Sequence, residues 1–95
     1  MINNSAVRPG RRQLRPVILQ GGQYSEWCCY LITVRRGREK WKDSYNIWGY
    51  GEGDTRAEAL IEARQDFADG GREYGRDEYH YQFWRAIDEL NGEGN

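Results

Sequence analysis

The sequence has 95 residues, of which 38% are hydrophobic and 31% are charged. This length fits one domain with a modest core. No run of about 18 apolar residues is present to span a membrane, and the first residues lack the apolar stretch of a signal peptide. We therefore expect a cytoplasmic protein that does not bind membranes.

The formal net charge of −1 hides a strong asymmetry along the chain. Residues 1–42 hold nine Arg and Lys against two Glu, a balance of +7. Residues 43–95 hold five Arg against thirteen Asp and Glu, a balance of −8. Such an asymmetry indicates a charged partner, or association between opposite halves of two copies.

The N-terminal part of the chain predicts a basic arm and two strands. Residues 1–13 are rich in Arg and poor in apolar side chains, which indicates a flexible basic arm, either functional or a simple disordered terminus. Residues 14–20 predict a short strand that ends at the turn Gly21-Gly22. Residues 27–36 predict a strand with two apolar faces, which is typical of a central strand.

A third strand is predicted over residues 41–50, where Trp41, Tyr45 and Ile47 alternate with polar residues. Glycines occupy alternate positions at the end of this strand and just after it, at 49, 51 and 53. They resemble a phosphate-binding loop, but Glu52 and Asp54 would repel phosphate and the lysine of that motif is missing. We expect these glycines to form a turn that leads sharply from the sheet into a helix.

Two helices are predicted after the strands. Thr55 and Glu58 form a capping box, and apolar residues recur at helical spacing through Phe67, before Gly70-Gly71 ends the helix. Residues 77–90 predict a second helix, although the aromatic run 79–84 also fits a strand. Residues 92–95 predict a frayed tail.

These elements define an α+β fold, with a three-stranded antiparallel sheet followed by two helices (β-β-β-α-α) that we expect to pack on one face of the sheet. Residues 14–91 form the single domain. The segment Gly51 to Arg56, with Ala59 and Ala63, resembles the third strand and final helix of double-stranded-RNA-binding domains. The segment Gly53-Asp54-Thr55, followed by Glu58, is similar to the strand-to-helix junction of HicB-type antitoxins. Both resemblances fall within residues 49–68 and imply a related fold.

Two charged surfaces are candidate partner-binding sites. Four carboxylates recur three or four residues apart on the first helix, which predicts either a solvated face or a docking surface for a basic partner. The turn between the second and third strands carries five cations and a Trp, which either discourage aggregation or contact phosphates or an acidic protein. With Trp48 as a second aromatic anchor beside Trp41, the candidate residues are Arg35, Arg36, Arg38, Lys40, Trp41, Lys42, Trp48, Glu58, Glu62, Asp66 and Asp69.

No residue set in the sequence predicts a catalytic centre. Cys28 and Cys29 are adjacent in a strand and point to opposite faces, so we expect reduced, partly buried thiols and no disulfide. With His80 as the single histidine, they do not complete a zinc site. We interpret His80 as a surface or hydrogen-bonded imidazole, and we expect no catalytic residue, no cofactor and no metal.

The function that these features predict is non-enzymatic protein binding. Four Trp and seven Tyr exceed what so small a core needs, and aromatic residues with Arg anchor interfaces. Size, glycine content and charge polarity resemble small phage-encoded inhibitors of bacterial defence, anti-CRISPR proteins among them. That resemblance implies docking on a nucleic-acid-handling protein complex. The alternative is a nucleic-acid-binding protein that uses the basic arm and hairpin tip, and a homodimer is a further alternative.

Overall fold

A computed structural model describes residues 9–39, 42–69 and 80–92, with residues 80–83 described by their backbone alone. The predicted α+β class is confirmed, since a three-stranded antiparallel sheet precedes two helices. None of the helices in these ranges is long and apolar enough to cross a membrane. The elements are the 3-10 helix η2 (Arg11–Gln13), the strands β1 (Arg15–Gln20), β2 (Trp27–Arg35) and β3 (Ser44–Gly53), and the helices α1 (Arg56–Ala68) and α2 (His80–Leu90).

The strand order in the sheet is β1-β2-β3, so β2 is the central strand, as its two apolar faces predict. β1 pairs with β2 from Arg15↔Ile32 to Gln20↔Trp27. β3 pairs with β2 on the other side, from Trp27↔Gly53 to Arg35↔Ser44. Residues 28–32 of β2 are all buried, which requires cover on both faces of the sheet.

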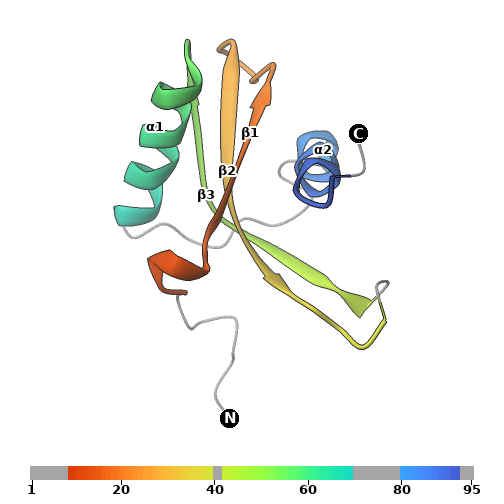
Figure 1. Ribbon diagram of the computed structural model, residues 1–95. Coiled ribbons are helices and arrows are strands. Elements are labelled where there is room, and N and C mark those ends of the chain that lie inside the picture. Colours follow the sequence, from red (N-terminus) through yellow and green to blue (C-terminus); the bar gives the residue numbers. More distant parts are fainter. Residues whose placement is uncertain (1–8, 40–41, 70–79, 93–95) are drawn as a thin grey trace.

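The two helices cover opposite faces of the sheet, as Figure 1 shows, with α1 on one side and α2 on the other. The prediction that both helices pack on one face is therefore wrong. The physical reason lies in β2, because its alternate residues are apolar on both faces. Each face removes its apolar surface from water only when a separate helix covers it.

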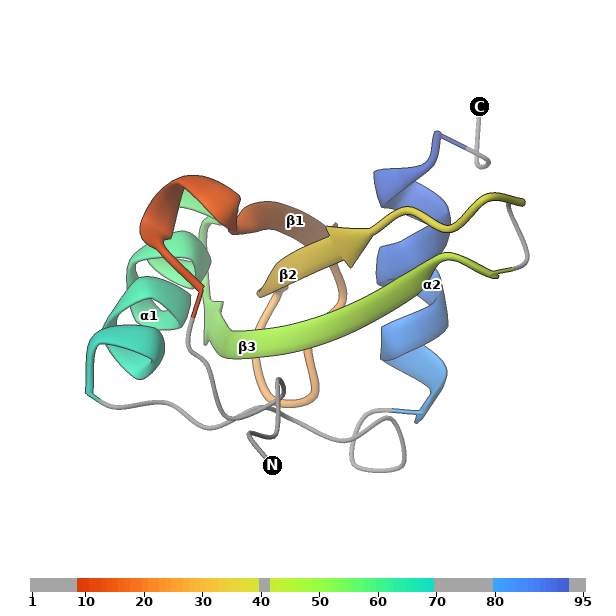
Figure 2. The ribbon, with the colours of Figure 1, turned by 90° about the horizontal axis from the view of Figure 1, so that it is seen from below.

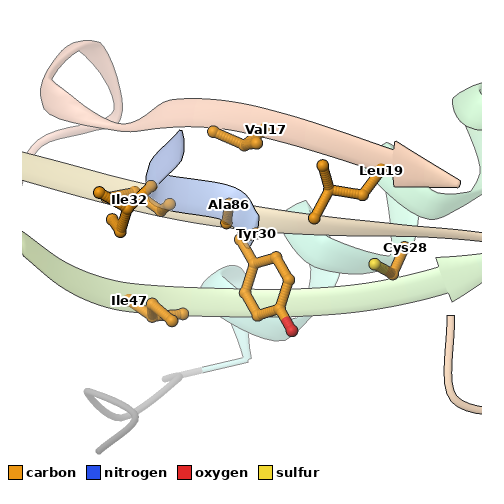
Figure 3. Packing of buried hydrophobic residues seen from close by; sticks show 8 residues of the cluster. Val17, Leu19, Cys28, Tyr30, Ile32, Ile47 and Ala86 are labelled. Carbon is orange, nitrogen blue, oxygen red and sulfur yellow. The ribbon is translucent and has the colours of Figure 1, made fainter. Parts of the chain in front are cut away.

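The cluster under α2 gathers side chains from all three strands, including Val17, Tyr30 and Ile47, against Ala86 and Ile87 of the helix (Figure 3). Two polar contacts fix α2 along the sheet. The guanidinium of Arg85 donates to the carbonyl oxygen of Gln20 at 2.8 Å. The side-chain amide of Asn91, just after the helix, donates to the hydroxyl of Tyr45 at 3.0 Å.

The cluster under α1 depends on small residues that let the helix approach the sheet closely. Ala59 and Ala63 are fully buried, with Phe67 beside them. A Cβ atom on Gly51 would lie 2.2 Å from the nitrogen of Ala63, and one on Gly49 would lie 2.8 Å from its oxygen. The glycines at 49, 51 and 53 are thus part of β3, and the predicted glycine turn is wrong. They are needed for close packing of the helix backbone.

A β-bulge in β3 bends the hairpin formed by β2 and β3. Leu31 pairs with Gly49 and Ile32 pairs with Ile47, which leaves Trp48 as the extra residue. Trp48 contacts the α1 cluster, while Ile47 belongs to the α2 cluster. Because a bulge increases local twist and bend, the outer end of the hairpin projects away from α1, on the side of the molecule where α2 lies (Figures 1 and 2).

Several predicted boundaries change. β3 begins at Ser44 and continues to Gly53, and residues 11–13 of the predicted arm form η2. The amide of Gly10 donates to Oε1 of Gln13 at 2.7 Å across that turn. Residues 1–8, 40–41, 70–79 and 93–95 lie outside the described residues, and with them most of the predicted arm, Gly70-Gly71, the start of the predicted second helix and most of the tail.

Candidate functional site

Helix α1 presents three different faces along its length, because residues three or four apart lie on the same side of a helix. Its buried face is formed by Ala59, Ala63 and Phe67. On one side of this buried face lie the four carboxylates that we call the acidic face: Glu58, Glu62, Asp66 and Asp69. On the other side lie Ile61, Arg64, Gln65 and Ala68.

Hydrogen bonds hold three carboxylates of the acidic face in place. The hydroxyl of Thr55 donates to Oε1 of Glu58 at 3.1 Å, and the amide of Glu58 donates back to that hydroxyl, which confirms Thr55 as the helix cap. Asp69 accepts from the side-chain amide of Gln65 at 2.8 Å. Asp66 accepts from the backbone amide of Tyr50 at 3.0 Å, which ties α1 to β3. The donors in these contacts are neutral, so the contacts orient the carboxylates and bring no positive charge to them.

Two hollows beside β3 adjoin the acidic face, with volumes of about 440 and 330 Å³. Among the described residues that line them there is no Lys or Arg, so both hollows are acidic. The larger is lined by Tyr24, Tyr50, Gly51, Glu52, Glu62, Gln65, Asp66 and Asp69. The smaller is lined by Ser25, Glu52, Gly53, Asp54, Glu58, Ile61 and Glu62.

Glu52 has a structural role that the sequence did not reveal. Its Oε1 atom accepts from the amides of Tyr24 at 2.7 Å and Ser25 at 2.9 Å, and its Oε2 accepts from the Tyr50 hydroxyl. Burial alone would raise the pKa of Glu52, but the hydrogen bonds from Tyr50, Tyr24, Gln23 and Ser25 outweigh it and lower that pKa below its ordinary value of 4.5. Ionised Glu52 therefore anchors the β1–β2 loop to β3.

Four of the cations predicted as partner-binding residues lie within the described part of the hairpin between β2 and β3. They are Arg35, Arg36, Arg38 and Lys42, and all four are exposed. We call these four residues the basic tip. Arg36 donates to the Oδ2 of Asp43 at 2.8 Å, and the amide of Gly37 donates to the other oxygen of Asp43 at 2.8 Å. Asp43 thereby fixes the base of the turn. The other two predicted residues of this surface, Lys40 and Trp41, lie outside the described residues.

Trp48 is a core residue, which corrects its prediction as an aromatic anchor at the surface. Only 7% of its surface is exposed, and it packs with Ala59, Ala63 and Phe67. Its indole N–H donates to the hydroxyl of Thr33 at 2.9 Å. The alternation that indicated a half-buried strand did not show that the bulge would turn Trp48 toward α1.

A groove of about 780 Å³ was not predicted from the sequence. It lies between η2 with the start of β1 and the third face of α1, which come close together in both Figure 1 and Figure 2. We call it the arginine groove. A local signal for its α1 wall was available, because Ile61 and Arg64 share a helix face that is neither the buried face nor the acidic face. The groove is lined by Arg11, Arg12, Leu14, Pro16, Leu31, Ile61, Arg64, Gln65, Phe67 and Ala68.

The two cysteines face opposite sides of the sheet, as predicted, with Cys28 in the α2 cluster and Cys29 in the α1 cluster. Both are free thiols and fully buried. Burial raises the pKa of Cys28 and raises that of Cys29 to about 12, so both stay neutral thiols. Within the described part of the chain, no group of three His, Cys, Asp or Glu side chains is placed to hold a metal ion. The side chain of His80 lies outside the described residues.

Comparison with known proteins gives no relative: no family model matches this chain, and neither does any curated protein or solved structure that was searched.

Proposed function

We propose that this protein is a non-enzymatic protein-binding module, an inhibitor that docks on a nucleic-acid-handling protein complex and blocks it. The observation that carries the proposal is the acidic face of α1. Glu58, Asp66 and Asp69 accept hydrogen bonds from neutral donors, and the hollows beside the acidic face are lined by further carboxylates. Pre-oriented charges lose less conformational entropy on binding than free ones, which favours affinity.

The sign of this charge supports a partner that handles nucleic acid. Proteins that bind nucleic acids gather Lys and Arg along a face or channel, and that surface attracts any rigid row of negative charges. Three carboxylates, Glu58, Glu62 and Asp66, recur about one helical turn apart, and a turn rises roughly 5.4 Å. The acidic face therefore competes with a phosphate backbone for such a channel. The size, glycine content and charge polarity of the chain support the same proposal through their resemblance to phage-encoded inhibitors.

The test is capture of the partner with variants matched in fold. We would replace the exposed carboxylates (E58Q, E62Q and D69N together) and keep Asp66, which bonds to β3. The control is a variant of the basic tip with R35Q and R38Q. Pull-down from a bacterial lysate with mass spectrometry should recover a nucleic-acid-handling complex with the wild type and the control, and lose it with the acidic-face variant.

The recovered complex should also lose binding to its nucleic acid when the protein is added, as measured by gel mobility shift. Addition of the acidic-face variant should leave that binding intact. Equal capture by all three proteins, or loss only with the basic-tip variant, would contradict this proposal.

A second candidate function, nucleic-acid binding, is favoured by the position of the basic tip. The hairpin carries Arg35, Arg36, Arg38 and Lys42 away from α1, where they can reach phosphates without contact from the acidic face (Figure 1). Titration of duplex DNA, RNA and single strands at two salt concentrations tests it. Binding that falls steeply with salt and is lost in the R35Q/R38Q variant would favour this second function.

A further inference from the structure

The arginine groove combines an apolar floor with cations on both walls. Leu14 and Phe67 contribute apolar surface, and Ile61, 62% exposed, stands at the α1 side. Arg11 and Arg12 belong to η2, whereas Arg64 belongs to α1. A volume of about 780 Å³ is in the range of ligand-binding clefts. The groove is large enough for several side chains of a partner.

The charge of the groove defines what it can bind. Among the described residues that line it there are three guanidiniums and no carboxylate. Guanidinium groups form paired hydrogen bonds with carboxylates, and these are stronger than hydrogen bonds between neutral groups. The apolar floor requires a ligand with aliphatic or aromatic groups, because burial of such surface supplies affinity.

We propose that the arginine groove binds a short acidic segment of a protein partner, in which Asp or Glu residues flank aliphatic or aromatic ones. The geometry favours a peptide over other anions. Since the cations stand on two walls with apolar surface between them, a ligand needs acidic groups on both sides of an apolar body. A fatty acid carries one anionic head and pairs with one wall. A phosphate backbone leaves Leu14, Ile61 and Phe67 uncovered.

This binding is independent of the function proposed for the acidic face. The groove and the acidic face lie on different sides of α1, so two partners, or two parts of one partner, can be held at once. Ile61 and Gln65 line both the groove and the hollows beside the acidic face, but Arg12 and Arg64 line only the groove and Glu58, Glu62 and Asp69 do not line it, so variants of these residues change one surface at a time. Failure of one proposal is therefore distinguishable from failure of the other.

The experiment uses fluorescein-labelled synthetic peptides in which acidic and aliphatic residues alternate, with binding measured by fluorescence anisotropy on the full chain. One control peptide has Ser in place of the aliphatic residues, and another has Lys in place of the acidic ones. The acidic–aliphatic peptide should bind, with an affinity that falls as salt rises. Both control peptides should bind at least about tenfold more weakly, since each loses one of the two kinds of contact.

Two groove variants locate the site: R12Q and R64Q, one on each wall. Each Arg replacement should weaken peptide binding about tenfold, because it removes a charge-assisted hydrogen bond to the peptide. The matched control is R38Q, an exposed Arg of the basic tip, which should change the affinity less than twofold. Circular dichroism spectra of all variants verify that the fold is intact.

Several results would overturn the proposal. No binding of any acidic–aliphatic peptide would do so, and so would binding that R12Q and R64Q leave unchanged. Displacement of the peptide by dodecanoate at equal concentration would assign the groove to a single-headed amphiphile. Displacement by single-stranded DNA would assign it to phosphates. A dimer in sedimentation that R64Q dissociates would assign it to a second copy of the chain.

Discussion

Gly51 of β3 lies directly against the backbone of Ala63 in α1, so that a Cβ atom added to Gly51 would come within 2.2 Å of the Ala63 nitrogen. Contacts at that distance do not exist in folded proteins, and the atom in the way belongs to a helix backbone. The distance between the sheet and α1 is therefore fixed by the absence of a side chain at Gly51. The acidic face and the arginine groove both depend on this distance, since both are built on α1.

The G51A variant tests this close approach. The extra methyl group would push α1 away from β3, and overpacking of this kind costs about 1–3 kcal/mol or more. Urea denaturation followed by circular dichroism should show the lower free energy of unfolding. The control is G10A, where the added Cβ would meet only the Gln13 side chain at 3.8 Å, and we expect a change within about 0.5 kcal/mol. Equal stability of the two variants would contradict the packing described for Gly51.

The hydrogen bond between Trp48 and Thr33 predicts a second stability change. T33V keeps the shape of the side chain and leaves the buried indole N–H without its acceptor, at a cost of about 1–3 kcal/mol. T33S keeps the hydroxyl and is the control, with a smaller loss from the missing methyl group. Urea unfolding curves for the two variants give the comparison. If T33V proved as stable as T33S, the hydrogen bond from the Trp48 indole to the Thr33 hydroxyl would not contribute to stability.

Glu52 predicts a dependence of stability on pH. Its pKa is lower in the folded state than the ordinary 4.5, so its stabilisation is complete above the unfolded pKa and disappears as pH falls through the folded value. At neutral pH, E52Q should be less stable by about 1.5–3 kcal/mol, since hydrogen bonds to an ionised group are lost. The difference from the wild type should narrow below pH 4.5.

Thermal unfolding between neutral and acidic pH measures this difference for E52Q. The exposed E89Q on α2 controls for the loss of one negative charge. If the difference in stability between the wild type and E52Q stayed constant down to strongly acidic pH, ionisation of Glu52 would not be what anchors the β1–β2 loop.

The two buried thiols predict slow chemical labelling. Burial raises the pKa of Cys28 and raises that of Cys29 to about 12, so neither supplies thiolate at mildly alkaline pH. Ellman's reagent should react with the native protein only as fast as it unfolds, and at once in concentrated urea. The C28S variant keeps the thiol of Cys29 and the C29S variant keeps that of Cys28, so the reaction of each thiol can be measured separately. Immediate reaction of the native C28S protein would contradict burial of Cys29.

The same thiols predict the direction of the stability change at high pH. Because the folded pKa values exceed the unfolded value of 9.0, the stabilisation is complete below pH 9.0 and is lost as pH rises further. The C28S/C29S double variant should show a smaller loss of stability above pH 9.0 than the wild type. An identical loss in both proteins would assign the effect to other groups.

Local sequence patterns correctly predicted those features of the fold that depend only on residues close together in the chain. The opposite orientations of Cys28 and Cys29 follow from strand alternation, and the cap at Thr55 follows from a hydroxyl placed before a helical apolar pattern. The apolar stripe of α2 does not specify which side of a sheet it meets, and the signal for cover on both sides was instead in β2, whose two faces are both apolar. The glycines of β3 do not specify their place either, since a residue without a side chain fits a turn and a tightly covered strand equally well.

The arginine groove shows the limit of sequence patterns most clearly. Arg12 and Arg64 stand far apart in the chain, and the helix face that Arg64 shares with Ile61 does not by itself mark a site. Only the packing of η2 beside α1 brings their guanidiniums to one cleft. Trp48 illustrates the opposite case, in which an aromatic residue suited to an interface is buried because it is the extra residue of a bulge.

The two faces of the sheet are covered by different parts of the chain. Strands β1 to β3 and helix α1 are contiguous in residues 15–68, so one face is covered within that segment. On the other face, Cys28, Tyr30 and Ile32 are covered by α2, from residues 80–90. A chain truncated before α2 would therefore expose an apolar, aggregation-prone surface on that face.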